Sequence, residues 1–156
     1  AHKIKDLISS KESYIKANIK FVTRRDDAYK KSWKVKREFS GGILFNLGVH
    51  YFDLLFNVLG KPLDSKIDTL DDFTARGLSY FSQGQLNWFF SIDDQHLTEQ
   101  QNTIREFTID NIRIDFSSVS EDLHYLNYLE IINNNKFKFK EMYNVHQYIA
   151  NLYKHV

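Results

Sequence analysis

The sequence predicts an α+β domain, in which an open and mainly antiparallel β-sheet carries helices packed on one face. Three observations lead to this architecture. Apolar and polar residues alternate over residues 14–24, which is the pattern of a half-buried strand. Residues 73–92 and 102–116 each contain two strand-like runs joined by a short turn, which predicts two hairpins. Residues 40–60 are almost continuously apolar, as expected of a buried helix.

The composition excludes several classes of protein. A chain of 156 residues with 42% hydrophobic and 15% aromatic residues is large and apolar enough to form one folded domain. Its 21 Lys and Arg against 20 Asp and Glu give no basis for binding nucleic acid or an anionic membrane. The sequence has no cysteine, which excludes disulfides and thiolate metal sites. It also has no secretion signal and no apolar run of membrane-spanning length, so we expect a soluble, cytoplasmic protein.

The N-terminal part should begin with the tail of an amphipathic helix at residues 2–9. The strand over residues 14–24 follows, with its inward side formed by Ile15, Ala17, Ile19 and Phe21.

Residues 24–38 predict a basic loop, in which seven lysines and arginines surround Tyr29 and Trp33. A solvated linker is the simplest interpretation, because exposed Lys and Arg contribute little to stability. The alternative is a mobile loop at the mouth of a cleft, where it holds an anionic ligand. In that case Lys34 is the residue that we expect to contact the anion.

The central helix is predicted at residues 40–60. Ser40 is a suitable N-cap, the two glycines after it allow a tight entry, and Gly60 followed by Pro62 ends the helix. Polar residues interrupt the apolar run at spacings of four, three and four. At about 100° per residue they share one stripe, formed by Asn46, His50, Asp53 and Asn57.

This stripe has two interpretations. In the first, the four groups hydrogen-bond to one another and to nearby backbone inside a packed core. In the second, the stripe lines a cleft, where Asp53 orients the imidazole of His50 for proton exchange with a substrate hydroxyl.

The remaining residues supply the rest of the sheet and two more helices. A strand is expected at residues 64–69, and the second hairpin turns at Asp110-Asn111, which tolerates left-handed conformations. One sheet face should cover the central helix. The other face exposes aromatic residues, which is typical of a partner surface, and these are Tyr14, Tyr80 and Phe89.

Helices are expected at residues 120–133, with His124 in the first turn, and at 141–156. The inward side of the last helix would be formed by Met142, Val145, Ile149 and Leu152. We expect His96 to be a surface residue of a polar connection without a functional role. No metal site is expected, because the six histidines form no H-x-x-x-H pair, and no nucleophile motif is present.

The run from Gly41 to Leu54 resembles the GGG-hydrophobic-x-(D/N)-x-G-x-H-x-x-D segment of the Gfo/Idh/MocA family of nicotinamide-dependent sugar oxidoreductases. In that family the histidine projects towards the nicotinamide and the sugar carbon being oxidised. The resemblance therefore implies that His50 transfers a proton. It also implies a substrate contact at Asn46, whose amide can hydrogen-bond but cannot act as a base.

Asparagine at position 46 is similar to the branch acting on UDP-N-acetylglucosaminuronic acid in bacterial lipopolysaccharide and O-antigen synthesis. The branch signature W-Y-x-x-S-W-K-G is matched from Tyr29 to Lys34, although its first Trp is replaced and its last Gly is Val35. Residues 89–93 and 121–124 resemble the W-x-L-S-I-D and D-L-H segments. The substrate-binding residues that we predict on this basis are Arg24, Tyr29, Ser32, Trp33, Lys34 and His124.

Members of the family carry an N-terminal Rossmann domain, whereas none of the six glycines here forms its G-x-G-x-x-G turn. The resemblance implies that residues 1–156 are the C-terminal substrate-binding and oligomerisation domain of a longer enzyme, inactive alone. NAD(P) would be bound mainly by the N-terminal domain. A homo-dimer or tetramer would form through the sheet face, and C3 of the uronic acid would be oxidised. Two alternatives stay open: a non-catalytic oligomerisation or binding domain, and a family dehydrogenase acting on another sugar or inositol.

Overall fold

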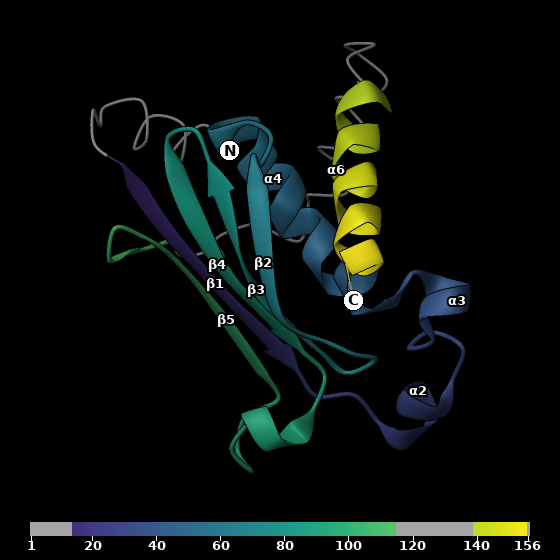
Figure 1. Cartoon of the computed structure of the whole chain (residues 1–156). Helices are drawn as coiled ribbons and strands as arrows, with labels where there is room; N and C mark the ends of the chain where they lie inside the picture. Colours follow the sequence, from purple (N-terminus) through teal and green to yellow (C-terminus); the bar gives the residue numbers. More distant parts are fainter. Residues whose placement is uncertain (1–13, 115–138, 156) are drawn as a thin grey trace, which may run out of the picture.

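The computed structural model describes residues 14–114 and 139–155 (Figure 1). The helices expected at residues 2–9 and 120–133, the latter with His124, lie outside this part of the chain. The elements in chain order are β1 (Ile15–Thr23), α2 (Asp27–Lys31), α3 (Arg37–Ser40), the π-helix η1 (Leu44–Gly48), α4 (Val49–Leu59), β2 (Asp64–Leu70), β3 (Thr74–Phe81), β4 (Gly84–Ser91), the 3-10 helix η2 (Asp94–His96), β5 (Thr103–Ile109), β6 (Ile112–Arg113), α6 (Phe139–Leu152) and the 3-10 helix η3 (Tyr153–His155).

The six strands form one open sheet in the order β2-β3-β4-β1-β5-β6. The pair β1 and β4 is parallel, and the other four neighbouring pairs are antiparallel. Helices α4 and α6 lie side by side on one face of this sheet (Figure 1). The α+β architecture predicted from the sequence is therefore confirmed. Within residues 14–114 and 139–155, no helix has the length and apolar character needed to cross a bilayer.

Strand β1 has the alternation that its sequence predicts. Ile15, Ala17 and Ile19 are buried, whereas Lys16 and Asn18 between them are exposed. The alternating side chains place one apolar row against the helices and one polar row on the open face.

Both predicted hairpins are present in the structure. The turn between β3 and β4 consists of Ser82 and Gln83 only, because pairing extends to Phe81 and Gly84. In the second hairpin, Asp110 and Asn111 have φ values of 47° and 69°, as the left-handed preference of these residues predicts.

The central helix runs without interruption from residue 42 to 59 and contains the π-helix at its start. At the start of the helix, Gly41 and Gly42 have φ values of 80° and 79°. The Ser40 Oγ accepts a hydrogen bond from the Gly42 N–H at 3.1 Å. Gly60 ends the helix at φ 78°, and its N–H donates to the Phe56 carbonyl. The predicted end at Gly60 is confirmed. The predicted start is corrected, because Ser40 is the last residue of α3 and the central helix begins two residues later. The π-helix is new, since the Val49 N–H donates to the carbonyl of Leu44, five residues earlier.

The core lies between the sheet and the two long helices. The ring of Phe52 is fully buried and packs edge-on against Trp88, Phe90 and Tyr148. Met142 was expected to face inward and does not, since it is 40% exposed. The buried positions described on α6 begin only at Val145, so Met142 lies beyond the packed part of this helix.

The basic segment of residues 24–38 was predicted as a loop, and the structure corrects this, because short helices form part of the segment. It contains helix α2 and the first half of α3, and the Asp26 carboxylate caps α2 by accepting a hydrogen bond from the Tyr29 N–H at 2.7 Å. Two of its lysines form ion pairs with acidic residues far along the chain. Lys30 pairs with Asp94 and Lys36 with Asp72.

Candidate functional site

Asn46 of the central helix connects this helix to the segment that carries the predicted substrate-binding residues. Its side-chain amide donates to the Lys34 carbonyl at 2.9 Å and to the Ser40 Oγ at 3.2 Å. Tyr29, Lys34 and Asn46 also line one hollow together with Asp72. The hollow holds only about 10 Å³, so a sugar would have to lie over it rather than inside it.

Two cations lie near the ring of Tyr29. The guanidinium carbon of Arg25 is 4.9 Å from the centre of the Tyr29 ring, and the Lys34 ammonium is 5.9 Å from it. Arg25 was not singled out from the sequence, where it is one of seven similar charges. Its Nε is buried without a hydrogen-bond partner among the described residues.

Ser32 and Trp33 differ in what their side chains contact. The Ser32 hydroxyl donates to the Tyr29 carbonyl at 2.7 Å and accepts the Lys34 N–H at 3.2 Å, so it closes the end of α2. Trp33 is 60% exposed, so a ligand has access to its indole ring.

His50 and Asp53 lie one turn apart on α4, after the π-helix. His50 is exposed and Asp53 is half-buried, whereas the Asn57 side chain lies outside the described part. The first interpretation of the stripe requires the imidazole to lie inside a packed core. The exposure of His50 argues against that interpretation. The orientation of His50 by Asp53 stays a prediction.

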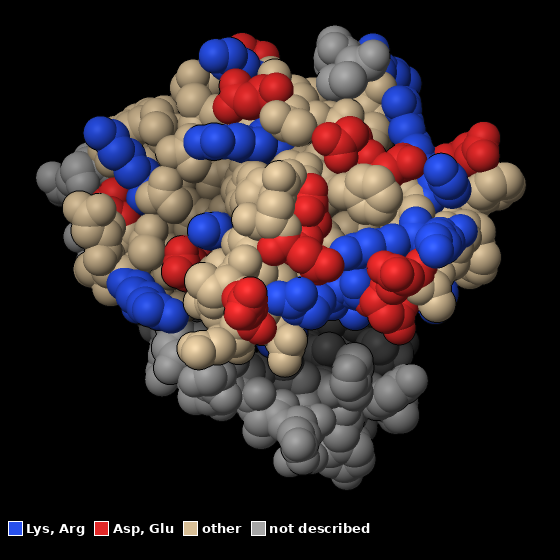
Figure 2. Space-filling model, turned by 90° about the horizontal axis from the view of Figure 1, so that it is seen from below, with Lys and Arg blue, Asp and Glu red and all other residues tan. Residues whose placement is uncertain are grey.

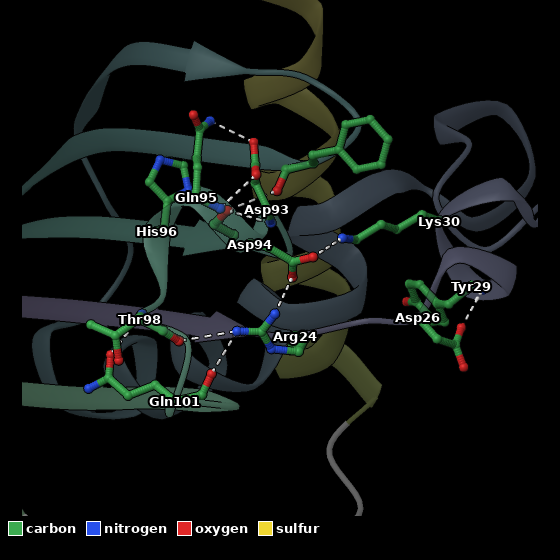
Figure 3. Close-up of polar contacts among 12 residues, drawn as sticks. Arg24, Asp26, Tyr29, Lys30, Asp93, Asp94, Gln95, His96, Thr98 and Gln101 are labelled. Carbon is green, nitrogen blue, oxygen red and sulfur yellow. Dashed lines mark hydrogen bonds and ion pairs between the residues drawn. The ribbon is translucent and has the colours of Figure 1, made fainter.

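Arg24 contacts the connection between β4 and β5 (Figure 3). Its guanidinium donates to the carbonyls of Thr98 and Gln101 at 3.1 and 3.2 Å, and it lies 3.9 Å from the Asp94 carboxylate. The structure thus gives Arg24 partners within the protein, and a contact with substrate stays a prediction.

The same connection holds two further polar groups. The Lys30 ammonium donates to Asp94 at 2.6 Å, and this hydrogen bond lowers the pKa of Asp94 from its ordinary value. His96 is half-buried rather than a surface residue, because its ring packs edge-on against Phe89 and its Nδ1 hydrogen-bonds with the Ser91 hydroxyl.

The helix entry at Gly41 and Gly42 does not form a dinucleotide site. A pyrophosphate would need backbone N–H groups at the start of a helix. Here the Gly42 N–H is bonded to the Ser40 hydroxyl, and the Leu44 N–H to the Tyr153 hydroxyl. Nor do the residues that the structure describes contain three His, Cys, Asp or Glu side chains grouped to hold a metal.

Comparisons with known proteins agree with the fold. The family model described as "Oxidoreductase family, C-terminal alpha/beta domain" matches residues 13–72, which include β1, the basic segment and the central helix. The WlbA (WbpB) dehydrogenase from Thermus thermophilus, in complex with NAD and UDP-GlcNAcA, is 27% identical over 97% of this chain, with a TM-score of 0.87. The chain is thus similar to the C-terminal domain of the Gfo/Idh/MocA oxidoreductases.

Two further solved structures share the fold. The same Thermus dehydrogenase, in complex with NAD and alpha-ketoglutarate, is 27% identical over 92% of this chain, with a TM-score of 0.84. An oxidoreductase from Thermotoga maritima shares the fold, with 14% identity over 95% of this chain and a TM-score of 0.63. This chain spans 48%, 50% and 54% of these three chains, which is about half of their length.

Proposed function

We propose that this chain is the substrate-binding C-terminal half of an NAD(P)-dependent dehydrogenase. Its substrate would be UDP-N-acetylglucosaminuronic acid, oxidised at the C3 hydroxyl during bacterial lipopolysaccharide or O-antigen synthesis. The observation that carries the proposal is the 27% identity over 97% of the chain to a dehydrogenase crystallised with NAD and UDP-GlcNAcA.

The site geometry supports a role for His50 in proton transfer. Oxidation of a secondary alcohol removes a hydride from carbon and a proton from oxygen, and an exposed imidazole is a suitable acceptor for that proton. NAD(P) would supply the hydride acceptor. Since the glycine-rich helix entry of this chain has its N–H groups occupied, we place the dinucleotide in a domain outside residues 1–156.

The anionic part of the substrate would bind beside the central helix. Tyr29 with its two neighbouring cations lies next to Asn46, one turn before His50, so a diphosphate or uronate could be held close to the sugar. We propose Trp33, Ser32, Arg24 and His124 as further substrate-binding residues.

Replacing His50 with alanine in the full-length protein tests the catalytic proposal. We expect kcat to fall about 100-fold or more, the range for loss of a general base, with NAD affinity nearly unchanged. His146→Ala is the matched control, because His146 is also exposed but lies on α6. Equal losses of turnover and NAD affinity in the His50 variant would instead indicate a structural histidine.

A panel of UDP-sugars, with and without the uronate carboxyl, tests the substrate. Reduction of the cofactor is followed by absorbance, and turnover should require the carboxyl group. Faster turnover of inositol or of a neutral sugar would favour another branch of the family.

A non-catalytic role remains the second candidate, and the open face of the sheet favours it. That face has a hollow of about 590 Å³, lined by polar and charged residues that include Asn18, Arg76, Asn87 and Glu106. We propose that a second copy of the chain covers this face in a homo-dimer or tetramer. Sedimentation at micromolar concentration tests the assembly, and a monomer would contradict it. Assembly without turnover on any sugar of the panel would support the non-catalytic role.

A further inference from the structure

Asp94 lies where the basic segment meets the sheet. It is the first residue of η2 in the connection between β4 and β5 (Figure 3). One oxygen of its carboxylate accepts a hydrogen bond from the Lys30 ammonium at 2.6 Å. The other oxygen is buried without a hydrogen bond among the described residues, and it lies 3.9 Å from the Arg24 guanidinium.

The two cations that contact Asp94 stand on either side of Tyr29 in the sequence. Arg24 precedes helix α2, and Lys30 lies in its last turn. Arg24 is also held by the carbonyls of Thr98 and Gln101, so both flanks of α2 are attached to the same connection. This arrangement fixes the position of α2 relative to the sheet.

The position of α2 in turn determines where the anion-binding groups lie. Tyr29 is a residue of α2, and the Lys34 ammonium and Arg25 guanidinium lie near its ring. The Lys34 carbonyl accepts the hydrogen bond from Asn46, so displacement of α2 would be transmitted to the central helix.

The cations of the basic segment (residues 24–38) differ in whether they form ion pairs with a carboxylate. The end of the molecule that carries α2 and η2 has basic and acidic side chains interspersed (Figure 2). Lys30 and Arg24 are partly neutralised by Asp94, and Lys36 pairs with Asp72. The cations beside Tyr29, Arg25 and Lys34, have no such ion pair within 4.0 Å among the described residues.

We propose that Asp94 is a positioning residue for the substrate site. It holds Lys30 and Arg24, thereby fixes α2, and leaves Arg25 and Lys34 beside Tyr29 to bind the diphosphate of a nucleotide-sugar. This inference rests on the proposed function, since it names the residues that place the anion-binding groups.

The test compares Asp94→Asn with wild type in the full-length protein. Hydrogen exchange at the amides of residues 26–36 should become several-fold faster, because the variant loses the charge that holds Lys30. The dissociation constant for UDP, measured by calorimetry, should rise about tenfold. The KM for the nucleotide-sugar should rise similarly, with kcat within about threefold of wild type, since Asp94 does not touch the reacting atoms.

Asp68→Asn is the matched control. Asp68 forms an ion pair with Lys66 at 3.7 Å, and its side chain is 45% exposed, against 42% for Asp94. This control should change neither the exchange of residues 26–36 nor the UDP affinity. Asp94→Glu keeps the charge and should restore most of the UDP affinity, and Lys30→Gln should weaken UDP binding as Asp94→Asn does.

Two results would overturn the role of Asp94. One is unchanged amide exchange in Asp94→Asn. The other is faster exchange with unchanged UDP affinity. If Asp94→Asn fails to fold, Lys30→Gln replaces it in both measurements. A wild-type protein that binds no UDP would overturn the proposed function itself, which distinguishes the two failures.

Discussion

Gly42 and Gly60, at the two ends of the central helix, both have a positive φ but lie in different surroundings. Their φ values are 79° and 78°, a region that other residues rarely adopt. A Cβ on Gly42 would lie 2.4 Å from the hydroxyl oxygen of Tyr153, whereas a Cβ on Gly60 would meet nothing within 4 Å. The first glycine is therefore needed for both conformation and space, and the second for conformation alone.

We predict that Gly60→Ala lowers the free energy of unfolding by about 2 kcal/mol, because Gly60 has φ 78° and ψ −166°, a conformation open essentially to glycine alone. Gly42→Ala should lower it by about 3 kcal/mol, because the methyl group also displaces the Tyr153 hydroxyl from the Leu44 N–H. Urea denaturation of the two variants measures the difference. Equal losses would show that the contact with Tyr153 relaxes without cost.

The central helix combines a buried apolar side with an exposed polar edge. Its π-turn lies between Gly42 and the α-helical part, and such turns are frequent at functional sites. The extra residue in this turn changes the angle between Asn46 and His50 from that of a regular α-helix, yet both remain exposed. The buried side is anchored by Phe52, which three aromatic rings surround.

We predict that Phe52→Ala lowers the free energy of unfolding by about 3–5 kcal/mol, because it leaves a cavity between helix and sheet. Phe39→Ala is the matched control. Phe39 is 66% exposed, and its loss should change stability by less than about 0.5 kcal/mol. Thermal or urea unfolding measures both. A small effect of Phe52→Ala would mean that the helix and the sheet collapse into the space.

The packing of the helices on the sheet buries three tyrosines whose hydroxyl groups titrate at alkaline pH. Burial raises the pKa of Tyr51, Tyr148 and Tyr153 above the ordinary value of 10.0. For Tyr148, burial raises the pKa by more than the hydrogen bonds with Ser65 and Ser79 lower it. The folded protein therefore keeps these protons to higher pH than the unfolded chain.

We predict that stability is maintained up to about pH 10 and falls as the pH rises further, because the unfolded chain then binds fewer protons than the folded one. Tyr148→Phe should make this alkaline decline shallower, although it also loses the two serine hydrogen bonds. Tyr143→Phe is the matched control on the same helix, with 63% exposure. Urea titrations at pH 9 and 11 provide the measurement, and an unchanged slope in Tyr148→Phe would contradict the assignment.

Several features were predictable because the physical chemistry that sets them is local. The side-chain period of two in β1 and β4 follows from the pleat of a strand. The helix end at Gly60 and the turn at Asp110-Asn111 follow from backbone preferences of single residues. The exposed positions of Asn46 and His50 were predictable for the same reason, whereas the Asn57 side chain of the predicted stripe lies outside the described residues.

Other features were decided by tertiary structure, because they depend on residues distant in the sequence. The parallel pairing of β1 with β4 has no local signal. The basic segment looked like a loop because Lys30 and its partner Asp94 are 64 residues apart. Asn46 could be placed on a face of its helix, but only folding shows that it meets the Lys34 carbonyl. The sequence by itself therefore determined the main strands, the central helix and the last helix, together with most of the candidate site residues, but not α2, α3, the π-helix or the place of Arg25. Tertiary structure decided which of the candidate site residues lie together, because contacts between distant residues produce no periodic pattern in the sequence.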